Sequence, residues 1–141
     1  MKMFVHEQII DGVVNKIHLS EPEIYVDNEK RGRSGHVGHA LIEFEPGKIM
    51  AFNANTSNRK LEGHAAFGWM EYRISEDYGK TWGEIKDFPY SKKEFYDGIH
   101  TVSVEKAVVC DNGDIIAFCL MNTTDAPASC EPWDVPKYVI S

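Results

Sequence analysis

The stretch Ser75-Glu76-Asp77-Tyr78-Gly79-Lys80-Thr81-Trp82 decides the fold of this chain. Its spacing predicts a tight hairpin turn, because the Asp77 carboxylate can accept hydrogen bonds from backbone N–H groups that follow it. Gly79 provides the positive φ that such a turn requires. Trp82 is expected to return along the next strand and to bury its ring. We therefore expect this stretch to join two neighbouring antiparallel strands.

The rest of the chain alternates short apolar runs with turn residues, a pattern that is typical of β-strands. Pro46-Gly47 and Asn112-Gly113 lie between such runs and are interpreted as hairpin turns. Only Ser91–Tyr96 is expected to form a short helical turn. The predicted fold class is all-β, built from consecutive antiparallel hairpins. The expected strands are Phe4–Ile10, Glu23–Val26, Val37–Phe44, Lys48–Ala54, Ala66–Ile74, Val102–Cys110, Asp114–Met121 and Lys137–Ile140.

An internal repeat divides the chain. Glu45–Phe52 aligns with Asp111–Phe118, and the two stretches lie 66 residues apart. The same shift, without a gap, places Glu71–Ser75 on Lys137–Ser141. Two separate matches at one shift indicate a structural repeat rather than a chance hairpin. Each unit holds about four strands, which is the size of one propeller blade.

The stretch from Ser75 to Trp82 matches the pattern Ser-x-Asp-x-Gly-x-Thr-Trp at every defined position. This pattern resembles the Asp-box of the sialidase (neuraminidase) superfamily, the BNR proteins, and the resemblance extends over residues 36–141. It implies a six-bladed β-propeller, of which this chain covers about two blades of four-stranded antiparallel sheet. In that family the hairpin joins the outer strands of a blade, away from the sugar-binding face. Ser75, Asp77, Gly79, Thr81 and Trp82 are therefore interpreted as structural residues.

The resemblance predicts three parts of the chain. Residues 1–35 form a leader whose strand Phe4–Ile10 pairs with the last blade. Residues 36–101 form the first blade with its Asp-box at 75–82, and residues 102–141 begin the second blade. Ser141 occupies the place of Ser75, so the second blade is expected to be truncated at its Asp-box. The alternative is that several copies of this chain assemble into one ring.

Composition excludes several classes of function. The chain has 141 residues and a net charge of −7, without a run rich in Lys and Arg, so neither nucleic acid nor a membrane surface is an expected partner. Glu7 and Asp11 interrupt any secretory signal, so we expect a cytoplasmic protein, or an extracellular one if a signal has been removed. Cys110, Cys119 and Cys130 form no zinc-binding pattern, and reduced thiols are expected. No cofactor is expected.

Two catalytic motifs of the sialidases are missing. The resemblance places an Arg-Ile-Pro motif, whose arginine holds the substrate carboxylate, at Val37-Gly38-His39, where it is absent. It places the acid/base aspartate near Phe67 and Trp69, and there is no Asp between Asn53 and Glu76. Either the pocket has been altered or the plain exo-sialidase reaction is not performed.

Loop residues supply the candidate site. His64 and Glu62 are the candidate catalytic acid and base, because imidazole and carboxyl side chains commonly perform proton transfer in catalysis. The candidates for binding a glycan or small sugar are Arg33, His36, His39, Arg59, Asp97 and His100. Two histidines alone do not make a metal site, so none is predicted. The competing interpretations are solvated loop charges for Arg31, Arg33 and Arg59, and packing for Trp69, Trp82 and Trp133.

Three hypotheses follow for the function. The first is a sialidase-like glycoside hydrolase, or part of one, with an altered pocket. The second is a non-catalytic propeller that binds a carbohydrate or a protein. The third is a scaffold in which copies of this chain assemble. The expected partners are a glycan, together with the remaining blades or other copies of the chain.

Overall fold

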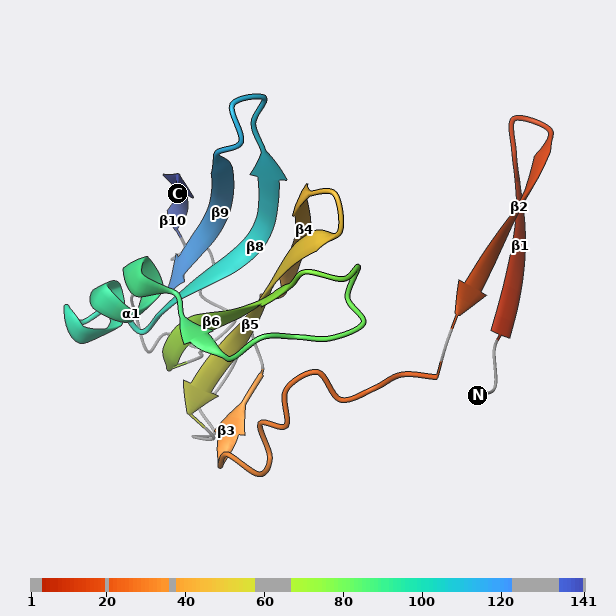
Figure 1. The fold of residues 1–141 in the computed structure, drawn as a ribbon. Coiled ribbons are helices and arrows are strands. Elements are labelled where there is room, and N and C mark those ends of the chain that lie inside the picture. The colour runs from red at the N-terminus through yellow and green to blue at the C-terminus, as the bar shows by residue number, and fades with distance from the viewer. Residues whose placement is uncertain (1–3, 20, 36–37, 58–66, 123–134, 141) are drawn as a thin grey trace, which may run out of the picture.

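The computed structural model describes residues 4–19, 21–35, 38–57, 67–122 and 135–140. The described chain is mostly β, with antiparallel sheets and one short helix (Figure 1). In chain order the elements are β1 Phe4–Ile10, β2 Val13–Leu19, β3 Arg33–Ser34, β4 Ala40–Glu45, β5 Lys48–Ser57, β6 Gly68–Ser75, β7 Lys86–Asp87, α1 Pro89–Tyr96, β8 Thr101–Val109, β9 Ile115–Asn122 and β10 Val135–Ile140.

The first sheet is centred on β5. This strand pairs with β6 along most of its length, and β6 pairs in turn with the short β7. On its other edge β5 pairs with β4 through its first half and with β3 through Thr56 and Ser57. The pairing β4-β5-β6-β7 therefore follows chain order, as expected of consecutive hairpins.

The second sheet, β8-β9-β10, repeats the pairing of β4-β5-β6 at the shift read from the sequence. Equivalent pairs are Ala40–Phe52 and Lys106–Phe118, Glu43–Ile49 and Val109–Ile115, and Phe52–Tyr72 and Phe118–Tyr138. The register of both hairpins is conserved under the shift. The predicted 66-residue repeat is thus confirmed at the level of strand pairing.

The hydrophobic core lies between the two sheets. The first sheet contributes Phe52, Ala54 and Met70, and the second contributes residues such as Val104 and Cys119. We call the side of the first sheet that carries Phe52 its inner face, and the opposite side its outer face. In β8 the pairing shifts between Val104 and Lys106, which marks a bulge. The extra residue explains how Val104 and Ala107, three positions apart, are both buried in the core.

Helix α1 connects the sheets and is fixed between them. Pro89 opens the helix, a position where its missing N–H costs nothing. Ser91 is fully buried; its hydroxyl accepts a hydrogen bond from Met70 N at 2.9 Å and donates one to Val102 O at 2.7 Å. One side chain thus joins β6 to β8, and the expected helical turn at Ser91–Tyr96 is confirmed, beginning at Pro89.

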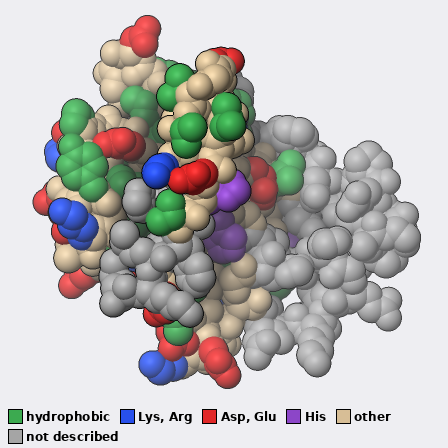
Figure 2. All heavy atoms as spheres, turned by 90° about the vertical axis from the view of Figure 1, so that its right-hand side faces the viewer, with side chains coloured by type: hydrophobic (Ala, Val, Ile, Leu, Met, Phe, Trp, Pro, Cys, Tyr) green, Lys and Arg blue, Asp and Glu red, His purple; other side chains and the backbone are tan. Residues whose placement is uncertain are grey.

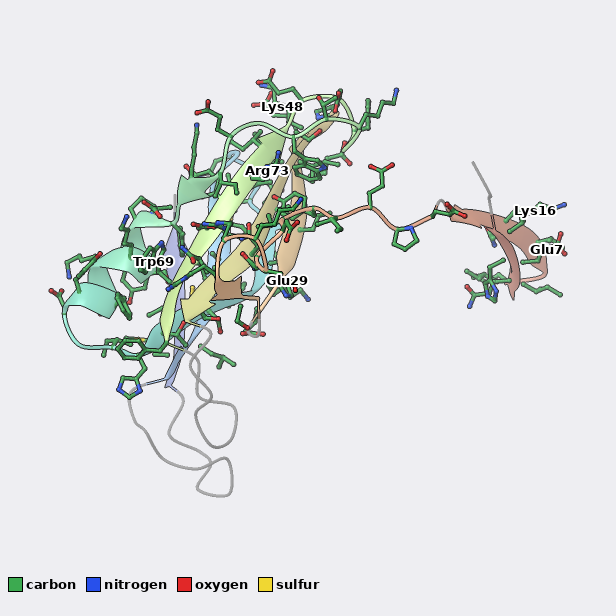
Figure 3. All side chains as sticks on the ribbon, turned by 90° about the horizontal axis from the view of Figure 1, so that it is seen from below. Glu7, Lys16, Glu29, Lys48, Trp69 and Arg73 are labelled. Carbon is green, nitrogen blue, oxygen red and sulfur yellow. The ribbon has the colours of Figure 1, made fainter. Side chains whose placement is uncertain are left out.

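Strands β1 and β2 form a separate hairpin, which stands apart from the sheets in Figures 1 and 3. Asp11 and Gly12 form its turn with φ of 52° and 78°, the pair of positive values that a two-residue hairpin turn requires. Among the described residues β1 pairs only with β2. The expected pairing of Phe4–Ile10 with a last blade therefore stays a prediction.

One expected strand is wrong. Glu23–Val26 forms no strand, and the backbone there is irregular. The reason is that Arg73, rather than a neighbouring strand, provides the hydrogen-bond donor for this backbone. The Arg73 Nη1 group donates to Tyr25 O at 2.8 Å. The strands β2, β3 and β7 were not expected. The described residues form these two sheets and the separate two-stranded sheet of β1 and β2, and no closed propeller.

Candidate functional site

The turn at Ser75–Trp82 joins β6 to β7 and is held by its own side chains. The Asp77 carboxylate accepts hydrogen bonds from Thr81 N at 2.8 Å, from Thr81 Oγ1 at 2.6 Å and from Ser75 Oγ at 2.8 Å. Gly79 has a φ of 79° and donates its N–H to Ser75 Oγ at 2.8 Å. The predicted turn, with a carboxylate at its centre, is confirmed.

Electrostatics assign Asp77 an acceptor role. The Thr81 hydroxyl, the Thr81 N–H and the Ser75 hydroxyl together lower the pKa of Asp77 to about 2. A carboxyl group with so low a pKa is ionised at neutral pH and cannot serve there as a general acid. The geometry agrees with the structural interpretation of the turn.

Trp82 packs differently from the prediction. It lies before β7 rather than within a strand, and it is half-buried. Its ring contacts Tyr25 edge-on, with the ring centroids 4.8 Å apart. The Arg73 guanidinium holds the backbone after the turn against β6, because it donates to Trp82 O at 3.0 Å and to Gly83 O at 2.7 Å. Segment 21–34 is thereby attached to the turn at Ser75–Trp82.

The outer face of the first sheet carries a buried polar network. Arg31 donates both guanidinium ends to Glu71, at 2.8 and 2.7 Å. Asn55 Nδ2 donates to the same carboxylate at 2.8 Å. The hydrogen bonds that Arg31 donates to the Glu71 carboxylate raise the pKa of Arg31 further above its ordinary value. Arg31, interpreted above as a solvated charge, therefore anchors segment 21–34 on the sheet.

Arg33, a predicted binding residue, is the only one of the predicted site residues within the described chain that joins this network. Its Nε donates to Asn55 Oδ1 at 2.6 Å and its Nη2 to Asn55 O at 2.9 Å. Its guanidinium lies 5.5 Å from the centroid of the Trp69 ring. The hydrogen bonds to Asn55 occupy one side of the guanidinium fork, while Nη1 donates to no group among the described residues.

A row of aromatic rings runs from Trp69 towards the start of β8, and we call it the aromatic row. Trp69 contacts Phe95 at 5.4 Å, Phe95 contacts Phe67 at 5.0 Å, and Phe67 contacts His100 at 5.3 Å, between ring centroids. Tyr96 stacks on Trp69 and is 70% exposed. Figure 3 shows Trp69 beside α1.

Charged groups hold Trp69 in place. Its Nε1 donates to Asp87 Oδ1 at 2.7 Å, and Lys92 Nζ lies 5.0 Å from its ring centroid. Lys92 also bonds Asp87 Oδ2 at 2.6 Å. Burial acts to raise the pKa of Asp87, but the hydrogen bonds from Lys92 and Trp69 outweigh it, so this pKa lies below its ordinary value. Asp87 is therefore an ionised acceptor for both groups.

The other predicted site residues are dispersed. His39 is exposed, with Nε2 3.1 Å from Gly35 O. Asp97 is exposed at the end of α1 and accepts a hydrogen bond from Lys93 at 2.7 Å. His100 belongs to the aromatic row, and its carbonyl accepts from Gly68 N at 3.0 Å. The candidates outside the described residues are His36, Arg59, Glu62 and His64.

Sequence reasoning missed the aromatic row. The sequence interpretation assigns Trp69 to packing, names Phe67 only as the place of a missing aspartate, and predicts no ligand contact for Phe95 or Tyr96. A signal was present, since Phe67 and Trp69 alternate on one strand next to the loop that carries the catalytic candidates. What the sequence does not show is that the end of α1 returns to the same place.

The described residues contain no group of three or more His, Cys, Asp or Glu side chains that could hold a metal ion. Within the same residues no helix is long and apolar enough to cross a membrane. On the face shown in Figure 2, acidic and basic side chains are scattered among apolar ones. No protein-family model, curated protein or solved structure matches this chain.

Proposed function

We propose that this chain is part of a sialidase-like β-propeller glycoside hydrolase, and that a glycan binds along the aromatic row. The row, with cations beside it, is the observation that carries the proposal. Two further observations support the propeller. The register of strand pairing is repeated in two consecutive sheets, and an Asp-box turn lies between the last two strands of the first sheet. Each sheet would be one blade, the first at residues 36–101 and the second beginning at 102.

The chemistry of the row suits a sugar. Sugars present apolar C–H faces that pack on aromatic rings and hydroxyl groups that need hydrogen-bonding partners. Tyr96 offers an exposed ring, while Arg33 and Lys92 offer donors near Trp69. Because these donors are cations, an acidic sugar is the favoured ligand.

Catalysis in this proposal comes from the loop that joins β5 to β6. Chain connectivity requires this loop to leave at Ser57 and to return at Phe67, one of the rings of the row. Glu62 and His64 lie on it and would act as the acid and base for glycosidic bond cleavage. These two residues would share two tasks: proton transfer to the leaving oxygen and activation of the attacking group.

A specific observation favours a second candidate, glycan binding without hydrolysis. Arg31 is engaged with Glu71 and Arg33 with Asn55, so neither presents a complete fork to a substrate carboxylate. Together with the missing Arg-Ile-Pro motif, this leaves the described residues without the expected carboxylate clamp.

One set of assays separates the two candidates. The protein is tested for binding on a glycan array and for turnover of aryl glycosides, including a sialoside. Under the first candidate, Glu62→Gln or His64→Ala abolishes turnover, and Tyr96→Ala weakens binding. Tyr78→Ala is the matched control, because Tyr78 is 68% exposed but lies in the Asp-box turn. Binding without turnover selects the second candidate, and neither binding nor turnover in a folded protein refutes both.

A further inference from the structure

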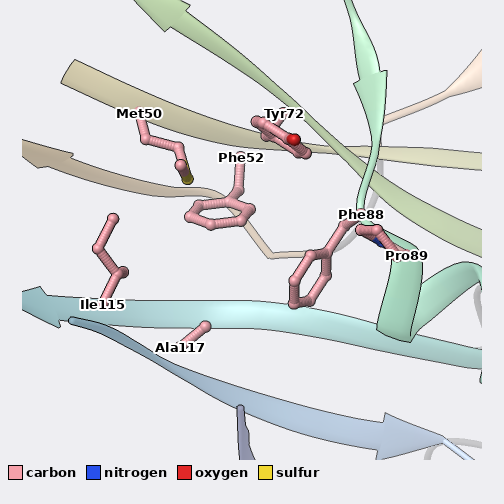
Figure 4. A pocket seen from close by; sticks show the side chains of 7 residues that line it. All are labelled: Met50, Phe52, Tyr72, Phe88, Pro89, Ile115 and Ala117. Carbon is pink, nitrogen blue, oxygen red and sulfur yellow. The ribbon is translucent and has the colours of Figure 1, made fainter. Parts of the chain in front are cut away.

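A cavity of about 220 Å³ lies between the two sheets (Figure 4). Phe52 and Tyr72 of the first sheet line it opposite Ile115 and Ala117 of the second. Phe88 and Pro89, at the start of α1, line it as well. Except for the Tyr72 hydroxyl, these side chains are apolar, and that hydroxyl has no hydrogen-bond partner among the described residues.

The repeat identifies the residues of the first sheet that are equivalent to the cavity-lining residues of the second sheet. Ile115 and Ala117 correspond, at the 66-residue shift, to Ile49 and Ala51 of β5. Ile49 and Ala51 lie on the outer face of the first sheet, next to the turn that carries Trp82 and beside Tyr25. A Cβ placed on Gly79 would lie 3.7 Å from both Ile49 Cδ1 and Trp82 Cζ2, so the indole and Ile49 flank the same glycine.

Aromatic rings lie on the far side in both places. On the outer face of the first sheet, the Tyr25 ring contacts the indole of Trp82 edge-on. On the corresponding face of the second sheet, the first sheet itself takes that covering position, with Phe52 and Tyr72. By the 66-residue shift, the cavity wall at Ile115 and Ala117 corresponds to the part of the first unit beside which the Trp82 indole lies.

We propose that this cavity binds an indole ring, and that the indole N–H donates to the Tyr72 hydroxyl. Apolar cavities of about 150 Å³ bind benzene, so about 220 Å³ accommodates a larger bicyclic ring. The indole can be a tryptophan side chain on a turn like Ser75–Trp82, or a free indole. The inference rests on the repeat and not on the proposed glycan function.

Binding is measured by NMR, from the methyl signals of Ile115 and Ala117 in the 141-residue chain. One arm adds free indole, and the other adds a peptide with the sequence of residues 75–82. Saturable shifts at both methyl groups are expected with at least one probe. Shifts with both free indole and the peptide indicate that the cavity recognises a tryptophan side chain. Shifts with indole alone indicate that it binds a free ligand. The absence of saturable shifts with either probe overturns the proposal.

Variants test the location. Ala117→Leu fills the cavity; it should abolish indole binding and raise Tm by about 3 °C. The matched control is Ala51→Leu, the same change at the equivalent position, where Tyr25 donates its hydroxyl to Ala51 O. This control should lower Tm through overpacking and leave indole binding intact. Indole binding that survives Ala117→Leu contradicts the proposal.

Tyr72→Phe provides a second, less disruptive variant. Removing the hydroxyl should weaken indole binding about fivefold, the value of one hydrogen bond. Benzothiophene has the same shape as indole but lacks the N–H, so its affinity should not change in this variant. Equal losses for both ligands would show that the hydroxyl does not bond the indole N–H.

Discussion

The ion pair between Arg31 and Glu71 makes a sharp test of how segment 21–34 is attached. Glu71 is almost fully buried, with 5% of its side chain exposed, whereas 31% of the Arg31 side chain is exposed. The Glu71 carboxylate accepts two hydrogen bonds from Arg31 and one from Asn55, all between 2.7 and 2.8 Å. Asn53 adds a long contact of 3.4 Å. The perturbation is Arg31→Met, which keeps the aliphatic packing and removes the charge.

The expected loss can be worked out from this geometry. Removing one member of a buried ion pair costs about 3–5 kcal/mol, because the remaining charge stays buried without its partner. Arg31 is partly exposed, so water can replace some of the lost bonds, and Asn55 keeps its own. The lower end of this energy range therefore applies, and we expect the free energy of unfolding to fall by about 3 kcal/mol at neutral pH.

Urea denaturation, followed by tryptophan fluorescence, measures this loss. With a slope of about 2 kcal/mol per molar urea, the midpoint should fall by about 1.5 M. Arg31→Met combined with Glu71→Leu removes both charges and should recover about 2 kcal/mol of the loss. A fall below about 1 kcal/mol for Arg31→Met, or no recovery in the double variant, would refute the buried pair.

Three further predictions concern single residues. Because hydrogen bonds from Thr81 lower the folded-state pKa of Asp77 to about 2, below its unfolded value, Asp77 stabilises the fold above about pH 4, and this contribution is lost as pH falls towards 2. Asp77→Asn should therefore flatten the pH dependence of urea midpoints across that window. Gly79→Ala should cost about 1 kcal/mol, because φ is 79°, whereas Gly12→Ala, with φ of 78° in the separate hairpin, should leave the unfolding midpoint of the sheets unchanged. Burial raises the pKa of Cys119 to about 11, so at pH 8 a thiol reagent should modify it far more slowly in the folded than in the urea-unfolded protein, as peptide mass spectrometry can measure.

Local signals were enough to predict most of the two sheets. Pro46-Gly47 and Asn112-Gly113 mark hairpin turns because glycine there adopts a positive φ, of 80° and 88°. The repeat then fixes which runs are equivalent. Asp11-Gly12 carries the same kind of signal, and the hairpin of β1 and β2 could have been predicted from it. Strand bounds differ by a few residues because tertiary pairing, not local propensity, ends a strand.

The candidate site was harder to predict because its contacts join distant parts of the chain. Arg31 and Glu71 are 40 residues apart, and each resembles an ordinary surface charge in the sequence. The rings of Trp69 and Tyr96 meet only because Ser91 fixes α1 between the sheets. Neither juxtaposition leaves a periodic pattern, and both depend on the fold as a whole.

Gly47 and its repeat mate Gly113 are not equally replaceable, although both turns look alike. A Cβ on Gly47 would meet the Tyr78 ring at 3.0 Å, and Tyr78 N donates to Gly47 O at 2.9 Å. Nothing lies within 4 Å of a Cβ on Gly113. Asparagine tolerates a positive φ, so it can replace Gly113 with little strain, whereas at Gly47 any side chain must also displace the Tyr78 ring. The Gly113 turn therefore accepts a substitution more readily than the Gly47 turn, which contacts the neighbouring turn at Ser75–Trp82.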